Sequence, residues 1–141
     1  MAYLDEVAAI IDANTTAAGT GSDFPIFRSH LPDSTVLGDR AVALIHTEGF
    51  GDMARVEVGG PGLQVVTRGR SILQTSTAYE EAYAVAEAVR SSLHEYTGTS
   101  ASSSGNHYVG IWSENGPFFA GFDETMRPLF SNNFRVQRSR T

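Results

Sequence analysis

The sequence predicts an α+β fold, in which two helices pack on one face of a mixed, mainly antiparallel β-sheet. A short β-rich run over residues 61–69 is bounded by Pro and Gly, which is typical of a strand. Residues 79–94 follow, with apolar residues at steps of three and four. The C-terminal third then changes to the period of two that strands show. This order indicates helices that cover one side of a sheet.

The helix over residues 79–94 has the clearest signals. Thr77 and Glu80 have the spacing of a capping box, which predicts that their side chains satisfy backbone N–H groups at the helix start. Glutamates near the start and Arg90 and His94 near the end agree with the helix dipole. The apolar stripe consists of Ala78, Ala82, Val85, Ala86, Val89 and Leu93.

Three elements are predicted in the N-terminal half. A helix over residues 2–13 carries an apolar stripe, and residues 24–27 begin an extended segment that Pro25 places at a sheet edge or at the start of a strand. Residues 41–46 are a nearly continuous apolar run, which favours a strand covered on both faces. The helix places Leu4, Val7, Ala8 and Ile11 on its stripe and Asp5, Glu6 and Asp12 on other faces.

The C-terminal third reads as a β-meander. Strands are predicted over residues 107–112, 116–122 and 129–136, and the polar separators between them predict two hairpins in series. In the second of these strands, Phe118 and Phe122 are expected on the face opposite to Phe119. The residues expected in the core include Leu44, Val65, Val85, Val89, Leu93, Ile111 and Phe134.

Composition restricts the class of protein. The 141 residues fit a single domain over 1–141. No apolar run approaches 18 residues, and residues 1–6 lack the basic start of a signal peptide, so we expect no membrane segment. There is no cysteine, which excludes disulfides and thiolate chemistry. The net charge is −6 and all ten basic residues are arginine, which disfavours sequence-independent binding of nucleic acid.

Residues with catalytic potential do not form a recognisable set. The nearest constellation is His46 with Glu48 and Asp52, which also fits a strand that ends in a polar turn. The carboxylate pair Asp123 and Glu124 lies in a predicted exposed turn, where no raised pKa is expected. We therefore predict no enzyme activity, no catalytic residues, no metal and no cofactor. A small hydrolase that uses the histidine constellation stays open as an alternative.

Several short motifs, in their order and spacing, resemble those of the tail terminator proteins of long-tailed bacteriophages, also called phage minor capsid proteins. The similarity covers residues 1–138. The motifs are Pro61-Gly62-Leu63-Gln64-Val65 with Arg68-Gly69, Tyr79-Glu80-Glu81-Ala82-Tyr83 before Ala86-Glu87-Ala88-Val89, Tyr108 to Trp112, Gly116-Pro117-Phe118-Phe119 with Asp123-Glu124, and Leu129 to Val136.

The resemblance implies a structural virion protein. It implies a homo-oligomer, a hexameric ring, that caps the head-proximal end of the tail tube, terminates tail polymerisation and joins the tail to the head connector. The implied partners are the tail tube protein and the connector or stopper protein, with DNA passing through the ring and no sequence-specific nucleic-acid binding. The implied place is the head–tail junction of the virion, after synthesis in the host cytoplasm. The alternative is another connector, a stopper or the tube protein.

Two polar connectors are the predicted contact segments. Residues 70–77 and 97–105 flank the second helix and are longer than a compact domain needs. The arginine-rich residues 135–141 fit either a nucleic-acid arm or a charged strand end that resists edge pairing. The interface candidates are Arg68, Arg70, Thr77, Thr97, Ser102 and Arg135, with Arg68 or Arg70 expected to pair with a carboxylate of a partner.

Overall fold

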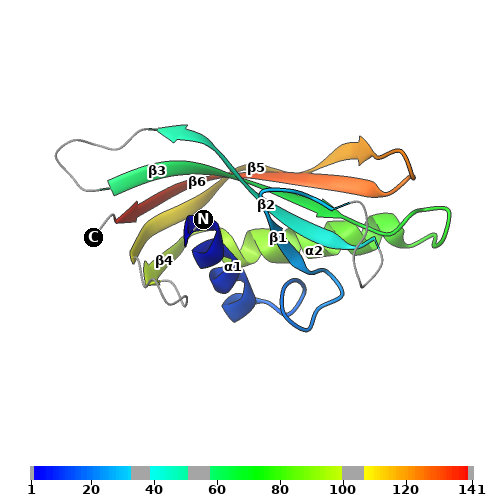
Figure 1. The fold of residues 1–141 in the computed structure, drawn as a ribbon, viewed down its shortest axis with the longest axis horizontal. Helices are drawn as coiled ribbons and strands as arrows, with labels where there is room; N and C mark the ends of the chain where they lie inside the picture. Colours follow the sequence, from blue (N-terminus) through cyan, green and yellow to red (C-terminus); the bar gives the residue numbers. More distant parts are fainter. Residues whose placement is uncertain (1, 33–38, 51–57, 100–106, 140–141) are drawn as a thin grey trace.

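The computed structural model describes residues 2–32, 39–50, 58–99 and 107–139. Its six strands form one sheet in the order β1-β2-β3-β6-β5-β4, and both helices lie on the same face of it (Figure 1). Only β1 and β2 pair in parallel. This confirms the predicted α+β fold. The elements are α1 (Ala2–Asn14), β1 (Ile26–Arg28), β2 (Ala41–Phe50), β3 (Val58–Arg68), α2 (Ala78–Leu93), β4 (Tyr96–Thr99), β5 (His107–Phe122) and β6 (Pro128–Ser139).

The core lies between the sheet and the two helices. Every residue that the sequence placed there is buried, from Leu44 on β2 to Phe134 on β6. The stripe of α1 is buried as predicted, but the prediction for Glu6 was wrong, since Glu6 is fully buried. The reason is that Ile10, one helical turn from Glu6, is also fully buried. Helix α1 contacts both β2 and α2, so it covers a wider sector than a single stripe.

The helix α2 matches its predicted stripe, but its start differs from the predicted capping box. Thr77 makes no capping hydrogen bond with its side chain, and its ψ of 7° is not extended. A capping side chain reaches the N–H groups of the first turn only from an extended N-cap residue. The Thr77 hydroxyl instead donates to Glu81 Oε2 at 3.3 Å. The acidic first turn with Glu80 and Glu81 still agrees with the helix dipole.

The prediction of two hairpins was wrong, because residues 107–122 form one long irregular strand. The register of β5 against β6 shifts on both sides of Asn115. Gly116 has φ of +106°, and an added Cβ there would lie 2.5 Å from the Ser131 carbonyl oxygen. The expected turn is therefore a bulge pressed against β6. Strands β5 and β6 form one hairpin, which closes through residues 123–127.

The ends of the meander also differ from expectation. The connector predicted over residues 97–105 begins as strand β4, and residues 100–106 lie outside the described part. Strand β6 lies inside the sheet and pairs with β3 as far as Ser139. Residues 135–139 are thus part of an inner strand, which corrects the prediction of a strand end at an exposed edge. A sequence period does not reveal the order of strands in a sheet, which explains the error.

Candidate assembly surface

An exposed aromatic cluster lies where the first turns of α2 meet the ends of β5 and β6. We call its four partly exposed members, Tyr79, Tyr83, Phe119 and Phe122, the aromatic ledge. The Tyr79 ring centroid lies 5.3 Å from that of Phe119, and Phe119 lies 5.0 Å from Phe122. All four rings are between 40% and 43% exposed, so they form a surface and not a core. Aromatic rings in contact stabilise one another beyond their buried area.

Phe130 forms the base of the aromatic ledge. It is buried, and its ring centroid lies 5.0 Å from that of Tyr79 and 5.6 Å from those of Tyr83 and Phe119. A further register shift, between Phe119 and Gly121, brings Phe119 and Phe122 onto the same face. This corrects the predicted alternation, in which Phe122 shared a face with Phe118. Phe130 beneath the rings and the register shift after Phe119 hold the exposed rings in place.

The charged groups beside the aromatic ledge are mainly acidic. Glu80 follows Tyr79, and Glu124 follows the end of β5, and both are exposed. The Tyr83 hydroxyl donates to Glu87 Oε1 at 3.2 Å. This hydrogen bond raises the pKa of Tyr83 above its ordinary value. The rim therefore favours a partner with basic side chains.

The loop over residues 70–77 stands at the same end of the molecule as the turn between β5 and β6 (Figure 1). Its Ile72 N–H donates to the Met126 carbonyl at 3.0 Å, and its Leu73 N–H donates to Ser71 Oγ at 3.2 Å. Arg70 forms a two-pronged ion pair with Glu81 at the start of α2. The loop is thus held by its own chain, and it leaves the Leu73 side chain 79% exposed.

Hydrogen bonds and ion pairs of charged side chains hold the turn between β5 and β6. Asp123 accepts hydrogen bonds from the backbone N–H and guanidinium of Arg127 and from Thr125. Burial alone would raise the pKa of Asp123, but these hydrogen bonds outweigh burial and hold it below its ordinary value. Arg127 also contacts Asp39 at 2.9 Å. Asp123 is thus an ionised anchor, a state that does not suit a general acid.

These groups line a depression of about 920 Å³ at this end of the molecule. Arg68 and Arg127 border it, and both of their side chains are buried and bonded within the chain. Within the described residues, no group of three His, Asp or Glu side chains could hold a metal ion. The ion pairs at this depression are therefore already formed between residues that line it.

The predicted interface residues fall on several separate surfaces. Arg68 is buried and donates to the backbone carbonyls of Asp39, at 2.6 Å, and Pro32, so it connects these two residues to the end of β3. Arg70 and Thr77 both donate hydrogen bonds to the Glu81 carboxylate. Thr97 is exposed on β4, away from them in the fold. Which of these residues touch a partner stays a prediction.

The remaining candidates are placed as follows. Arg135 is exposed on the sheet face without helices, 4.0 Å from Glu114 and beside Trp112. Ser102 lies outside the described residues, as do Asp52 and the side chain of Glu48. His46 is exposed on β2.

The sequence reasoning missed the aromatic ledge. The available signal was the pair Tyr79 and Tyr83, which are four residues apart and therefore share a helix face outside the apolar stripe. A second signal was the run over residues 118–122, which contains three phenylalanines and no charge. Neither signal shows that the two segments meet, since they are separated by about 40 residues of chain.

A small α+β domain that exposes such an aromatic surface has the features of a protein that assembles with other chains. The family model described as bacteriophage tail terminator protein matches residues 9–140. The chain therefore belongs to the bacteriophage tail terminator family, and it is a structural component of a phage tail. A search of curated proteins found no match. No helix in the described part is long and apolar enough to cross a membrane.

Proposed function

We propose that the protein forms a hexameric ring on the head-proximal end of the tail tube. The ring stops the addition of tube subunits and offers its other side to the connector or stopper protein of the head. The observation that carries this proposal is the family match, which extends over residues 9–140. A protein that ends one polymer and joins it to another particle needs contacts, and it needs no catalytic group.

Two properties of the chain support this role. A ring that closes requires two different surfaces on each subunit, which meet head to tail. The aromatic ledge supplies one apolar surface of this kind. The net charge of −6 also suits a ring through which DNA passes, because an acidic wall repels phosphate groups and does not retain the DNA.

The first experiment removes the protein from the assembling phage. Particles that lack the chain should carry overlong tails, or tails of abnormal length that are not joined to heads, in electron micrographs. Supplying the intact chain in trans should restore both tail length and joining. Empty heads without any tails would contradict a role in termination.

A second experiment separates termination from the alternative roles. Purified protein mixed with tail tubes should cap one end and prevent extension, and the mass of the capped end should correspond to six copies. A tube subunit would lengthen the tubes, and a connector or stopper would bind heads without affecting tube length. A triple variant of His46, Glu48 and Asp52 to alanine should cap tubes like the parent, since we assign no chemistry to them.

A further inference from the structure

One edge of the sheet is open beside the aromatic ledge. Strand β4 pairs with β5 only through Ile111, Tyr108 and His107, so among the described residues no strand covers β5 from Phe118 to Phe122. Every residue of this short segment is exposed or half-buried, and none is charged. Pro117, just before it, has no N–H to donate, which limits strand pairing to the part that follows. An uncharged open edge of this kind is a template for strand addition.

The exposed rings supply a large part of the area that a protein partner would cover at this edge. Phe118 lies on the sheet face opposite to the aromatic ledge and is 45% exposed, so aromatic rings flank the edge on both faces. Together the five rings leave on the order of 400 Å² uncovered. That is about half of the ~800 Å² that one partner contributes to a stable protein interface. Ala120 and Gly121 between the rings are small, so a second backbone can approach.

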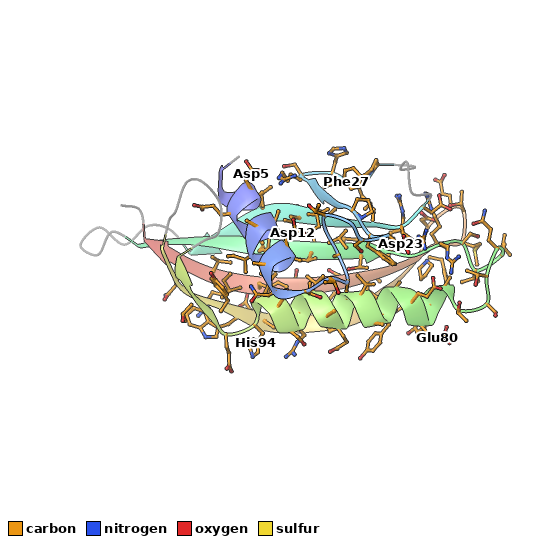
Figure 2. All side chains as sticks on the ribbon, turned by 90° about the horizontal axis from the view of Figure 1, so that it is seen from below. Asp5, Asp12, Asp23, Phe27, Glu80 and His94 are labelled. Atoms are coloured by element: carbon orange, nitrogen blue, oxygen red, sulfur yellow. The ribbon has the colours of Figure 1, made fainter. Side chains whose placement is uncertain are left out.

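The opposite edge of the same sheet is β1. Its residues Ile26 and Phe27 are half-buried, and Arg28 is exposed. In Figure 2, Phe27 on β1 and Glu80 at the start of α2 mark opposite sides of the molecule. The two edges are therefore different surfaces that face away from each other, as a head-to-tail contact requires.

The charges at the two edges are complementary. Glu80 and Glu124 rim the open edge of β5, and Arg28 ends β1. Arg28 pairs within its chain with Asp5, but both side chains are about half exposed, at 45% and 53%. An exposed ion pair of this type contributes little stability, so Arg28 can exchange Asp5 for a carboxylate of a neighbour. His30, beside Phe27 at a ring distance of 6.2 Å, adds an aromatic surface.

We propose that the open edge at Phe118–Phe122, with the aromatic ledge, receives the β1 edge of a second copy of this chain. Repeated around the ring, this contact joins the sheets of successive subunits edge to edge. The proposal rests on the ring under Proposed function and names the subunit surfaces that form it. The aromatic rings supply the apolar centre of the contact, and Arg28 with Glu124 supplies the charge at its rim.

Cysteine cross-linking tests the contact, because the natural chain has no cysteine. The double variant Ala120→Cys and His30→Cys places one thiol at each edge, on exposed residues. A short bis-maleimide reagent should link it into a ladder of covalent multimers, both in concentrated protein and on capped tubes. The matched control is His30→Cys with Ser91→Cys, which moves one thiol to an exposed site on the far half of α2. We expect at least tenfold less multimer from the control.

A charge in the edge provides the second measurement. Phe118→Arg should lower the fraction of protein that sediments as the ring at least tenfold, while Ser91→Arg should leave this fraction unchanged. Both sites are exposed, so circular dichroism should show the parent fold for each variant.

Three results would overturn the proposal. They are capped tubes without a ladder, dimers from Ala120→Cys alone, and normal rings from Phe118→Arg. Capped tubes without a ladder would reject the edge contact but leave the proposed capping function intact. A ladder of multimers without capping would support the edge contact and reject the proposed function.

Discussion

At the scale of single residues, Asp123 and Arg127 connect parts of the chain that are far apart in sequence. Asp123 holds the turn between β5 and β6, and Arg127 links this turn to Asp39, which precedes β2. The Arg127 side chain is 10% exposed, and those of Asp123 and Asp39 are 20% and 25% exposed. Ion pairs with this degree of burial are sensitive to the loss of one partner, because the remaining charge stays poorly solvated.

The first prediction concerns Asp123→Asn. Because the folded protein holds the pKa of Asp123 below its ordinary value, the ionised carboxylate contributes its full stabilisation at any pH well above that ordinary pKa. The variant should lose about 1–2 kcal/mol of unfolding free energy at neutral pH. As the pH falls toward the lowered pKa and Asp123 becomes protonated, the difference between parent and variant should shrink. Urea unfolding at neutral pH and near pH 3 measures both values.

The neighbouring carboxylate provides the control for this measurement. Glu124→Gln removes an exposed charge of the same turn and should change the unfolding free energy little at either pH. An Asp123→Asn difference that is equal at both pH values would show that the carboxylate charge contributes nothing.

Residues of this kind are difficult to identify from sequence. The apolar core residues were predicted correctly, because periodicity reports which face of an element is covered. Asn132 shares the buried face of β6 with Phe130 and Phe134, where an apolar residue is expected. It is kept there by a hydrogen bond from its Nδ2 to the Ala86 carbonyl at 3.4 Å. Glu6 was misjudged because its burial depends on how α1 packs against both β2 and α2, which the period of the helix alone does not show.

At the scale of elements, the packing of α2 against the end of β3 depends on Gly69. A Cβ at this position would lie 2.9 Å from Ala82 Cβ and 3.0 Å from the Ala78 carbonyl oxygen. Both atoms belong to the first turns of α2, and neither can rotate away. Gly69 thus sets how closely the helix approaches the sheet beneath the aromatic ledge.

The second prediction is that Gly69→Ala destabilises the protein by about 1–3 kcal/mol, because the helix must shift to accept the methyl group. Removing the facing methyl should relieve part of this strain. The double variant Gly69→Ala with Ala82→Gly should therefore be more stable than the sum of the single changes by at least about 0.5 kcal/mol. Chemical denaturation of the four proteins in the cycle measures this coupling energy.

A matched cycle uses Ala84→Gly, at an exposed position of the same helix. This change carries the same intrinsic loss of helix propensity, roughly 1 kcal/mol, without contact to Gly69. We expect no coupling in this second cycle. Equal coupling in both would mean that helix propensity, and not the close approach, explains the result.

The elements also show where sequence patterns become ambiguous. Existence and type were correct for both helices and for the strands around residues 26, 41–46, 61–69 and 129–136. The failure at residues 113–116 has a physical cause, since a Gly-Pro pair in a β-rich run fits a hairpin turn as well as a bulge. The unbroken partner strand β6 decides between them, and its length becomes visible only in the paired sheet.

At the scale of the whole molecule, most of the exposed large apolar side chains among the described residues gather at one end, and Trp112 is an exception. Leu73 and Met126 lie on the two segments that are joined there by the hydrogen bond from Ile72, and Phe122 directly precedes the turn that carries Met126. The sequence predicted the loop over residues 70–77 as a contact segment from its length and polarity. It did not reveal that the loop is fixed by Arg70 and Glu81, because such a pair is recognised only in the fold.

The last prediction concerns this loop in the proposed capping reaction. Leu73 is 79% exposed on a loop that is held in shape, so Leu73→Ala should leave the unfolding free energy nearly unchanged. If the loop contacts a neighbouring subunit or the tube, the same change should lower the apparent affinity for tube ends about tenfold or more. Arg70→Glu should also weaken capping, because it places two carboxylates together and releases the loop.

The swap of both charges, Arg70→Glu with Glu81→Arg, distinguishes the two ways in which Arg70 can act. If Arg70 serves to hold the loop, the swap restores the ion pair within the chain and with it most of the capping. If Arg70 reaches a carboxylate of a partner, the swapped protein keeps its fold but still fails to cap. Normal capping by Leu73→Ala and by Arg70→Glu together would remove the loop from the interface, since neither its exposed tip nor its fixed shape would then matter for binding.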